Sequence, residues 1–166
     1  LYIAKSCSPN AKICAVVKAN AYGHGLEYGV SGFKDADGLA LIEPEGAFRL
    51  RELGWRKPIL LLEGIFDATD LEVAMQAKVD FTIHSFEQIT LLEKTSLKGP
   101  FSVHLKMNTG MNRLGFKPVN YRIAYERLRV LPKVCKITLM THFANADDSL
   151  NSGLPLKEQI RQFEQG

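Results

Sequence analysis

The sequence predicts an α/β protein built on a parallel sheet, and three observations carry that prediction. Short apolar runs rich in Val, Ile and Leu recur along the chain with a period of roughly 20–25 residues. Most of them are separated by stretches with the spacing of amphipathic helices. The runs are nearly continuous rather than alternating, which is typical of parallel strands that are buried on both faces.

Six strands are expected from these runs. They are residues 13–17, 38–42, 58–62, 79–84, 101–106 and 136–142. Each run is short enough to be a strand rather than a helix. A strand followed by a helix, repeated in this way, is the pattern of α/β folds.

Three of the intervening stretches carry clear helix signals, at residues 43–54, 67–78 and 85–95. In the first, Ala47 and Leu50 fall on one apolar stripe. The second opens on Asp67 and the third on Ser85, both of which are favoured helix N-caps. We therefore expect a helix in each stretch, with its apolar stripe against the sheet.

Two architectures fit this alternation, the open doubly wound sheet and the (β/α)8 TIM-type barrel. The first strand is not followed by GxGxxG, which weakens the dinucleotide-binding version of the open sheet. Four polar residues stand where expected strands end, namely Lys18, His84, Lys106 and His142. Functional groups of barrels gather at such positions, so the barrel is favoured. About six β/α units are present, two short of closure, and residues 1–166 are expected to form one incomplete barrel domain.

Composition narrows the possible partners. The 166 residues are 46% hydrophobic and 23% charged, with a net charge of +3. The basic residues are scattered, which argues against a nucleic-acid partner, and no apolar run approaches the roughly 20 residues of a membrane span. Leu1 begins without an initiator methionine or a targeting region. These features favour a cytoplasmic protein.

The three cysteines predict neither a disulfide framework nor a metal site. Cys7, Cys14 and Cys135 are odd in number and form no CxxC pair. We expect them to be small buried hydrophobic residues in a reducing compartment. No set of convergent metal ligands can be placed around the histidines, so no metal is expected.

The stretch AVVKANAYGHG, residues 15–25, contains the first candidate for covalent chemistry. Lys18 closes an apolar strand, and an amine that loses hydration tends towards its neutral, nucleophilic form. At a barrel mouth it could form an imine with an aldehyde, and the Tyr22 hydroxyl could bind a phosphate. A surface lysine that happens to follow a strand remains the alternative, and His24 could simply fill a turn.

Two later stretches add cations and a histidine at strand ends. In LKMNTGMNRLGF, residues 105–116, Lys106 ends a strand and a Gly-containing loop then presents Arg113. Two cations at one mouth would suit a phosphate, carboxylate or phenolate, although Arg113 could equally lie in solvent. In LMTHFANADD, residues 139–148, His142 ends a strand and Asp147 and Asp148 follow. A lone histidine there, like His104 within the fifth strand, is more often structural.

Together these stretches resemble the alanine racemases, which are pyridoxal-phosphate (PLP) enzymes of fold type III. AVVKANAYGHG is similar to the cofactor-lysine signature of that family, and LKMNTGMNRLGF to its later lysine–TGM–arginine segment. THFANAD resembles a third block of the family, and LLLEGIFDATDL is similar to a family segment in its position and its residues. The resemblance covers essentially the whole chain, in order.

The resemblance implies a role for five residues. Lys18 would carry PLP as an imine and act as one of two acid/base groups at the substrate Cα, and Tyr22 would bind the cofactor phosphate. Arg113 would face the phenolic oxygen of PLP and the substrate carboxylate. Lys106 matches a position that is often carbamylated and orients that arginine, and His142 would join the hydrogen bonds under the pyridine ring.

The resemblance also implies what the chain would lack and what it would do. The family's last barrel strands, its N-terminal lead-in and its C-terminal β-domain have no counterpart here, and that domain supplies the second base from the partner subunit of a homodimer. Asn108 stands where the family usually has aspartate. The expected function is interconversion of L- and D-alanine for peptidoglycan in the cell wall, by a fragment that is inactive alone. The alternative is a non-catalytic PLP-binding homeostasis protein of similar fold.

Overall fold

The computed structural model describes residues 1–147 and 154–166 and divides the chain into two compact units. The first unit is residues 1–81 and the second is residues 82–166. The strands are β1 (Cys14–Val16), β2 (Gly38–Leu41), β3 (Ile59–Leu61), β4 (Asp80–Ile83), β5 (Phe101–Met107) and β6 (Val134–Thr141). The helical segments are α1 (Tyr2–Cys7), α2 (Lys18–Tyr22), α3 (Leu26–Gly32), α4 (Pro44–Glu52), α5 (Ala68–Ala77), α6 (Phe86–Lys94), α7 (Pro118–Arg129) and α8 (Leu156–Gln165).

The predicted fold class is confirmed. The six strands follow one another in the order of the sequence, and every pair whose register is described is parallel. A doubly wound sheet reverses its strand order at a switch point, so this order agrees with a barrel type of winding. In the part of the chain that the structure describes, the sheet is not closed.

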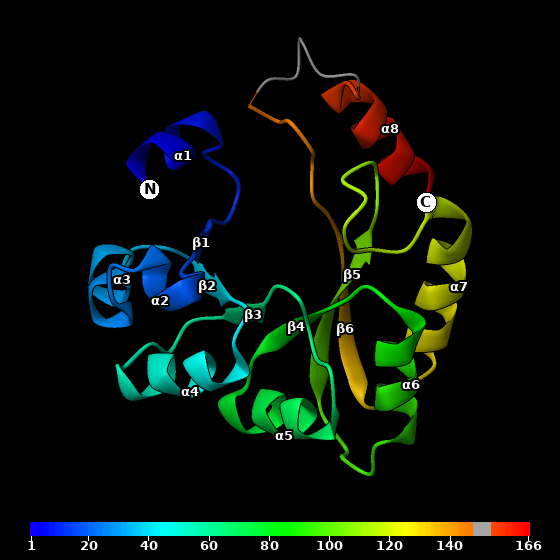
Figure 1. Ribbon diagram of the computed structural model, residues 1–166, viewed down its shortest axis with the longest axis horizontal. Coiled ribbons are helices and arrows are strands. Elements are labelled where there is room, and N and C mark those ends of the chain that lie inside the picture. Colours follow the sequence, from blue (N-terminus) through cyan, green and yellow to red (C-terminus); the bar gives the residue numbers. More distant parts are fainter. Residues whose placement is uncertain (148–153) are drawn as a thin grey trace. The chain divides into compact units, whose positions relative to one another are not determined.

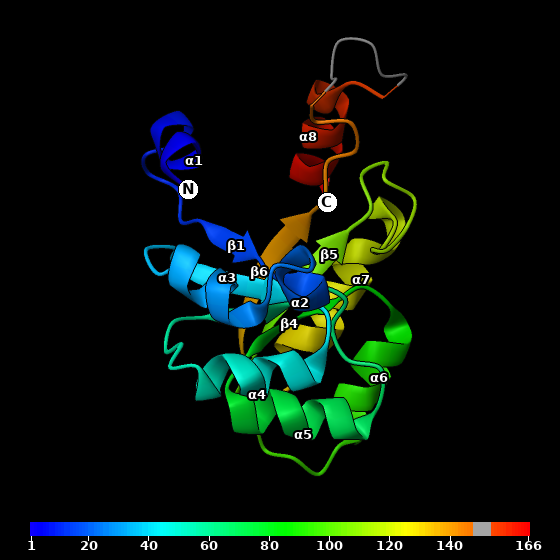
Figure 2. The same cartoon turned by 60° about the vertical axis from the view of Figure 1, so that its left-hand side comes forward.

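The core of the first unit lies between the sheet and the helices α4 and α5. All four residues of β2 are buried, and Leu50 of α4 and Leu71 of α5 are fully enclosed. The two helices run alongside each other in both views (Figure 1, Figure 2). Asp67 caps α5 as predicted, because its Oδ1 accepts a hydrogen bond of 3.0 Å from the amide of Asp70.

The core of the second unit lies between β5 and the helices α6 and α7. Phe101, Val103 and Leu105 alternate along β5 and are buried. Ile89 of α6 and Leu128 of α7 are fully enclosed. By contrast, β6 is nowhere fully buried, and Leu139 on this strand is 52% exposed. Gly, Asn and Ser residues in the stretch 149–154 predict a loop there, and all of this stretch except Leu154 lies outside the described residues.

The prediction that the cysteines are buried is wrong. Cys7, Cys14 and Cys135 are all exposed and free. Cys7 ends α1, which has no buried residue, and the other two lie on β1 and β6, the first and last strands of the sheet order. Strands at those positions have a neighbour on one side only, which the apolar character of the local sequence does not reveal.

Tyr121 ties α7 to the sheet, and its removal gives a testable pH effect. The buried hydroxyl donates a hydrogen bond of 2.8 Å to the carbonyl oxygen of Leu105, and burial raises the pKa of Tyr121 to about 12. We expect Tyr121→Phe to lower the free energy of unfolding by about 0.5–1.5 kcal/mol, because this hydrogen bond is lost.

The raised pKa also fixes the direction of the pH dependence. The folded state favours the neutral phenol, so this stabilisation is complete below the unfolded pKa near 10 and is lost as the pH rises towards 12. Urea unfolding at pH 8 and at pH 11 should therefore show a smaller decline for Tyr121→Phe than for the unchanged protein. Tyr125→Phe, at a more exposed position of α7, is the matched control. Equal declines in all three proteins would contradict the assignment.

Candidate functional site

Lys18 lies two residues beyond β1, at the carboxyl end of the strand. The amide of Val17 donates a hydrogen bond of 2.7 Å to the carbonyl oxygen of Ala40, which extends the pairing with β2 up to the lysine. Lys18 is half-buried, and its amine has no hydrogen-bond or ion-pair partner among the described residues. A partly desolvated amine without a counter-ion is suited to nucleophilic chemistry.

The four residues after Lys18 form an unusual left-handed turn, which we call the lysine turn (Ala19–Tyr22). Their φ angles are 51°, 53°, 53° and 54°, and the first three have ψ angles of 51°, 50° and 49°. This conformation costs roughly 1–2 kcal/mol for each L-residue and rarely persists over consecutive residues. Strain of this kind is kept where the surroundings enforce it, and it is concentrated at functional sites.

Side chains from the turn and from the next strand hold the lysine turn. Asn20 accepts a hydrogen bond of 2.9 Å at its Oδ1 from the amide of Leu26, the first residue of α3. Glu43, two residues beyond the end of β2, accepts a bond of 3.2 Å at its Oε1 from the amide of Ala19. Sequence reasoning missed Glu43. The signal that could have identified Glu43 is its position just beyond a strand, because Lys18 stands at the same position after the preceding strand.

Tyr22 and His24 continue this segment on the surface. Tyr22 is 60% exposed, and its hydroxyl has no partner among the described residues. Gly23 and Gly25 both have positive φ angles, of 85° and 95°. His24 is exposed, and its amide donates to the carbonyl oxygen of Ala21 at 3.1 Å. The tyrosine is therefore available to a ligand, while the histidine amide completes the turn.

In the second unit, β5 runs into a closed loop that carries Arg113. This Arg113 loop (residues 108–115) is fastened at its base by two backbone bonds. The Asn108 amide donates to the Phe116 carbonyl oxygen at 2.8 Å, and the Phe116 amide donates to the Lys106 carbonyl oxygen at 2.9 Å. Gly115 has φ 120°, and a Cβ there would lie 2.7 Å from the Asn108 nitrogen, so the loop base accepts only glycine.

The Asn108 side chain shapes the interior of the Arg113 loop. Its Oδ1 accepts bonds of 3.0 Å from the amides of Gly110 and Asn112, and its Nδ2 donates to the Asn112 Oδ1 at 3.0 Å. Asn112 adopts φ 56°, which asparagine tolerates better than most residues. A neutral amide thus forms the turn without bringing a carboxylate into the loop. Arg113 is exposed, and its guanidinium has no partner among the described residues.

Lys106 and His142 occupy neighbouring strand ends in this unit. Lys106 is the second-last residue of β5 and is only 6% exposed. It is in register with Met140 of β6. His142 directly follows β6. The two strand ends are joined by a hydrogen bond of 2.8 Å between the hydroxyls of Thr109 and Thr141. Asp147 is exposed, and Asp148 lies outside the described residues.

Each unit therefore places its candidate residues at the carboxyl ends of its strands. Lys18 and Tyr22 belong to the first unit, whereas Lys106, Arg113 and His142 belong to the second. Their convergence on a single cofactor stays a prediction. Among the residues that the structure describes, no group of His, Cys, Asp or Glu side chains could hold a metal ion, and no helix is long and apolar enough to cross a bilayer.

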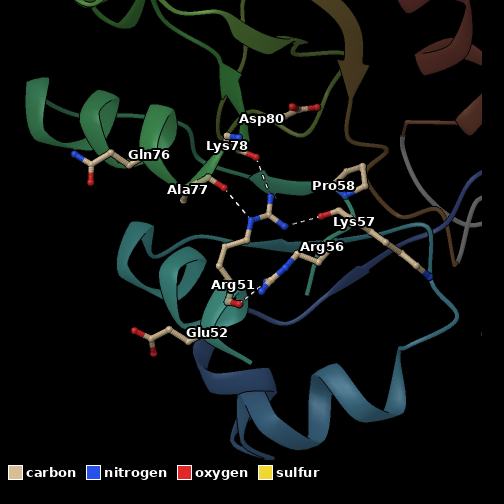
Figure 3. Close-up of a pocket in the computed structure, with 9 residues that line it drawn as sticks. All are labelled: Arg51, Glu52, Arg56, Lys57, Pro58, Gln76, Ala77, Lys78 and Asp80. Carbon is tan, nitrogen blue, oxygen red and sulfur yellow. Dashed lines mark hydrogen bonds between the residues drawn. The ribbon is translucent and has the colours of Figure 1, made fainter. Parts of the chain in front are cut away.

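A pocket of about 710 Å³ lies at the opposite ends of the strands, beside the starts of β3 and β4 (Figure 3). Arg51 lines this pocket. Its guanidinium donates four hydrogen bonds, to the carbonyl oxygens of Trp55, Lys57, Ala77 and Lys78. Burial, followed by the nearby Arg56, lowers the pKa of Arg51. This cation joins α4 to the end of α5 and to the residues before β3, so it contributes to the fold.

The fold and the lysine turn define a class of parallel α/β domain that presents an amine at the carboxyl ends of its strands. Residues 2–166 match the family described as "Alanine racemase, N-terminal domain". The chain belongs to that family.

Relatives and solved structures agree with this assignment. The chain is 56% identical over 165 residues to an alanine racemase of Janthinobacterium sp. (strain Marseille), with 99% of this chain and 46% of that protein covered. For an alanine racemase of Acinetobacter baumannii (strain SDF), the identity is 50%, with 99% and 45% covered. The crystal structure of the biosynthetic alanine racemase from Pseudomonas aeruginosa aligns with a TM-score of 0.89 at 40% identity, covering 97% of this chain and 45% of that one. The chain thus spans about half the length of these relatives.

Proposed function

We propose that this chain is the lysine-bearing part of a PLP-dependent alanine racemase, which interconverts L- and D-alanine and supplies D-alanine for peptidoglycan. The observation that carries the proposal is a half-buried Lys18 amine, without a partner among the described residues, that precedes a strained left-handed turn in a chain of the alanine racemase family. The same relatives favour this enzyme over a non-catalytic PLP-binding barrel.

The residues present fit the cofactor. The Lys18 amine, which has no partner among the described residues, can form a covalent bond to its aldehyde, and the exposed Tyr22 hydroxyl can donate a hydrogen bond to its phosphate. The Arg113 guanidinium, likewise without a partner in the described part of the chain, can bind an anionic oxygen, and His142 lies at a strand end of the same unit. When bound, PLP supplies an electron sink for the charge left at Cα by proton removal.

In the proposed reaction each of these side chains has a different role. Lys18 holds the cofactor and takes or returns the Cα proton on one face of the substrate. Arg113 orients the substrate carboxylate and stabilises negative charge. Lys106, buried beside the base of the Arg113 loop, orients that arginine. The proton on the other face requires a second group, which we assign to a tyrosine of the partner subunit in a cytoplasmic homodimer.

The direct test is racemisation by the full-length protein that contains this sequence. With PLP added, L-alanine should lose optical rotation and D-alanine should appear in a D-amino-acid oxidase assay. Borohydride reduction followed by peptide mapping should place the label on Lys18. Cofactor binding without any racemisation would instead support the non-catalytic alternative.

A separate prediction concerns Arg113. We expect Arg113→Ala to keep the covalent link to Lys18 while it lowers kcat by about 10²–10³-fold, because it removes charge stabilisation and not the amine. The matched control is Arg122→Ala, an exposed arginine on α7. Steady-state racemisation and the visible absorbance of the bound cofactor distinguish the two effects. Loss of the absorbance together with activity would show that Arg113 is needed for cofactor binding instead.

A further inference from the structure

The lysine turn is held from outside by a carboxylate 24 residues away in the sequence. Glu43 begins α4 as its N-cap residue, yet its side chain makes no capping bond to that helix. Its Oε1 accepts the amide of Ala19 at 3.2 Å, and its Oε2 accepts the amide of Ile42 at 3.4 Å. Both oxygens of this carboxylate therefore accept backbone N–H groups, one on each of two adjacent chain segments.

The bonded amide is the first N–H after the lysine. Ala19 is exposed and opens the left-handed turn, so without an acceptor its amide would be left to water and the chain could relax towards a right-handed conformation. Ala21, two residues further on, finds a backbone acceptor instead, because its amide donates to the carbonyl oxygen of Val17 at 2.9 Å. Glu43 is therefore a side chain that fixes the backbone directly after Lys18, beyond the end of β1.

The opposite side of the turn is fixed by close packing. Ala21 is 5% exposed and faces Gly29 of α3, where an added Cβ would lie only 3.0 Å from the Ala21 Cβ. The turn can therefore not move towards α3. Helix α3 is itself joined to α4 by an ion pair of 2.6 Å between Glu27 and Arg49. Glu43 closes this frame on the side of Ala19.

Glu43 makes these contacts without pairing with the lysine amine. Among the described residues Lys18 has no ion-pair partner, although the two side chains belong to adjacent strand ends. Had the carboxylate paired with the amine, the ion pair would have occupied it. By binding backbone instead, it leaves the amine available.

We propose that Glu43 is a positioning residue for Lys18, acting as a hydrogen-bond acceptor for the Ala19 amide. This inference rests on the proposed function of Lys18, but its first test does not. Hydrogen exchange of the full-length protein should show the Ala19 amide protected, although the residue is exposed. Exchange at the unprotected rate would overturn the proposal without any variant.

Three variants test the mechanism. Glu43→Ala should raise the exchange rate of Ala19 about tenfold or more, which is the scale expected for loss of a hydrogen bond to a charged group. It should slow the borohydride-trapped labelling of Lys18 by PLP by a similar factor. Glu43→Gln keeps an oxygen acceptor and should largely restore both. Glu45→Ala removes an exposed carboxylate from the same first turn of α4 and should change neither.

The pattern of outcomes decides between roles. If Glu43→Gln is as impaired as Glu43→Ala, or if the pH profile of labelling shifts in both, the charge acts on the lysine amine and the positioning role is wrong. If Glu45→Ala behaves like Glu43→Ala, the effect belongs to α4 as a whole. Protected Ala19 and slowed labelling in a protein that fails to racemise alanine would leave the role of Glu43 intact and refute only the proposed reaction.

Discussion

Replacing Lys18 with alanine is expected to abolish both the visible absorbance of the cofactor-bound protein and its racemase activity. In the proposed function one amine would serve two purposes, since it would make the covalent bond to the cofactor and move a proton at Cα. Loss of the acid/base function alone typically costs about 10²–10⁴-fold in rate. Loss of the covalent anchor adds to that, so we expect activity to fall by more than about 10⁴-fold.

Two further variants test whether the amine of Lys18 itself is required or only a positive charge. Lys18→Arg keeps a cation but cannot lose its proton at working pH, so it should be as inactive as Lys18→Ala. Lys12→Ala, at an exposed position shortly before β1, should retain full activity and absorbance. Absorbance spectra, optical rotation and borohydride labelling measure the three proteins. Labelling of another lysine in unchanged protein would refute the assignment of Lys18.

The regular part of the fold was predictable because its signals are local. Each expected strand overlaps an observed one, and the predicted N-cap Asp67 does cap α5. Buried strands favour continuous apolar residues, and a helix start favours a side-chain acceptor, so both leave marks in a few adjacent residues. Ser85, the other predicted N-cap, stands at that position of α6 but makes no side-chain capping bond. The same locality explains why Lys18 could be placed at a strand end from the sequence.

The features that shape the site were not predictable in this way. Ala19–Tyr22 contains only one residue type, asparagine, that favours the left-handed region, so the turn is imposed by tertiary contacts. One of these contacts comes from Glu43, whose partner is remote in the sequence. The exposure of Cys14 and Cys135 likewise depends on which strands have neighbours on both sides. Such properties arise only when distant segments pack together.

The second large effect concerns residues 1–166 on their own, which we expect not to racemise alanine. The family relatives are about twice as long as the chain, which covers 46% of one and 45% of another. We assign the second proton-transfer group to the remainder, and its loss alone would cost about 10²–10⁴-fold. In addition, no residue of β6 is fully buried, and Leu139 is 52% exposed. An apolar strand left open in this way pairs readily with other chains.

Complementation provides the measurement. Purified residues 1–166, supplied with PLP and L-alanine, should show activity at least about 10²-fold below that of the full-length protein, while the Lys18 amine can still be labelled after borohydride reduction. Adding a separately expressed C-terminal part of the same protein should restore turnover and reduce aggregation, because it covers β6 and supplies the second group. The same addition to the Lys18→Ala variant of 1–166 is the control and should restore nothing. Near-full activity from residues 1–166 alone would contradict the prediction, because both proton-transfer groups would then lie within this chain.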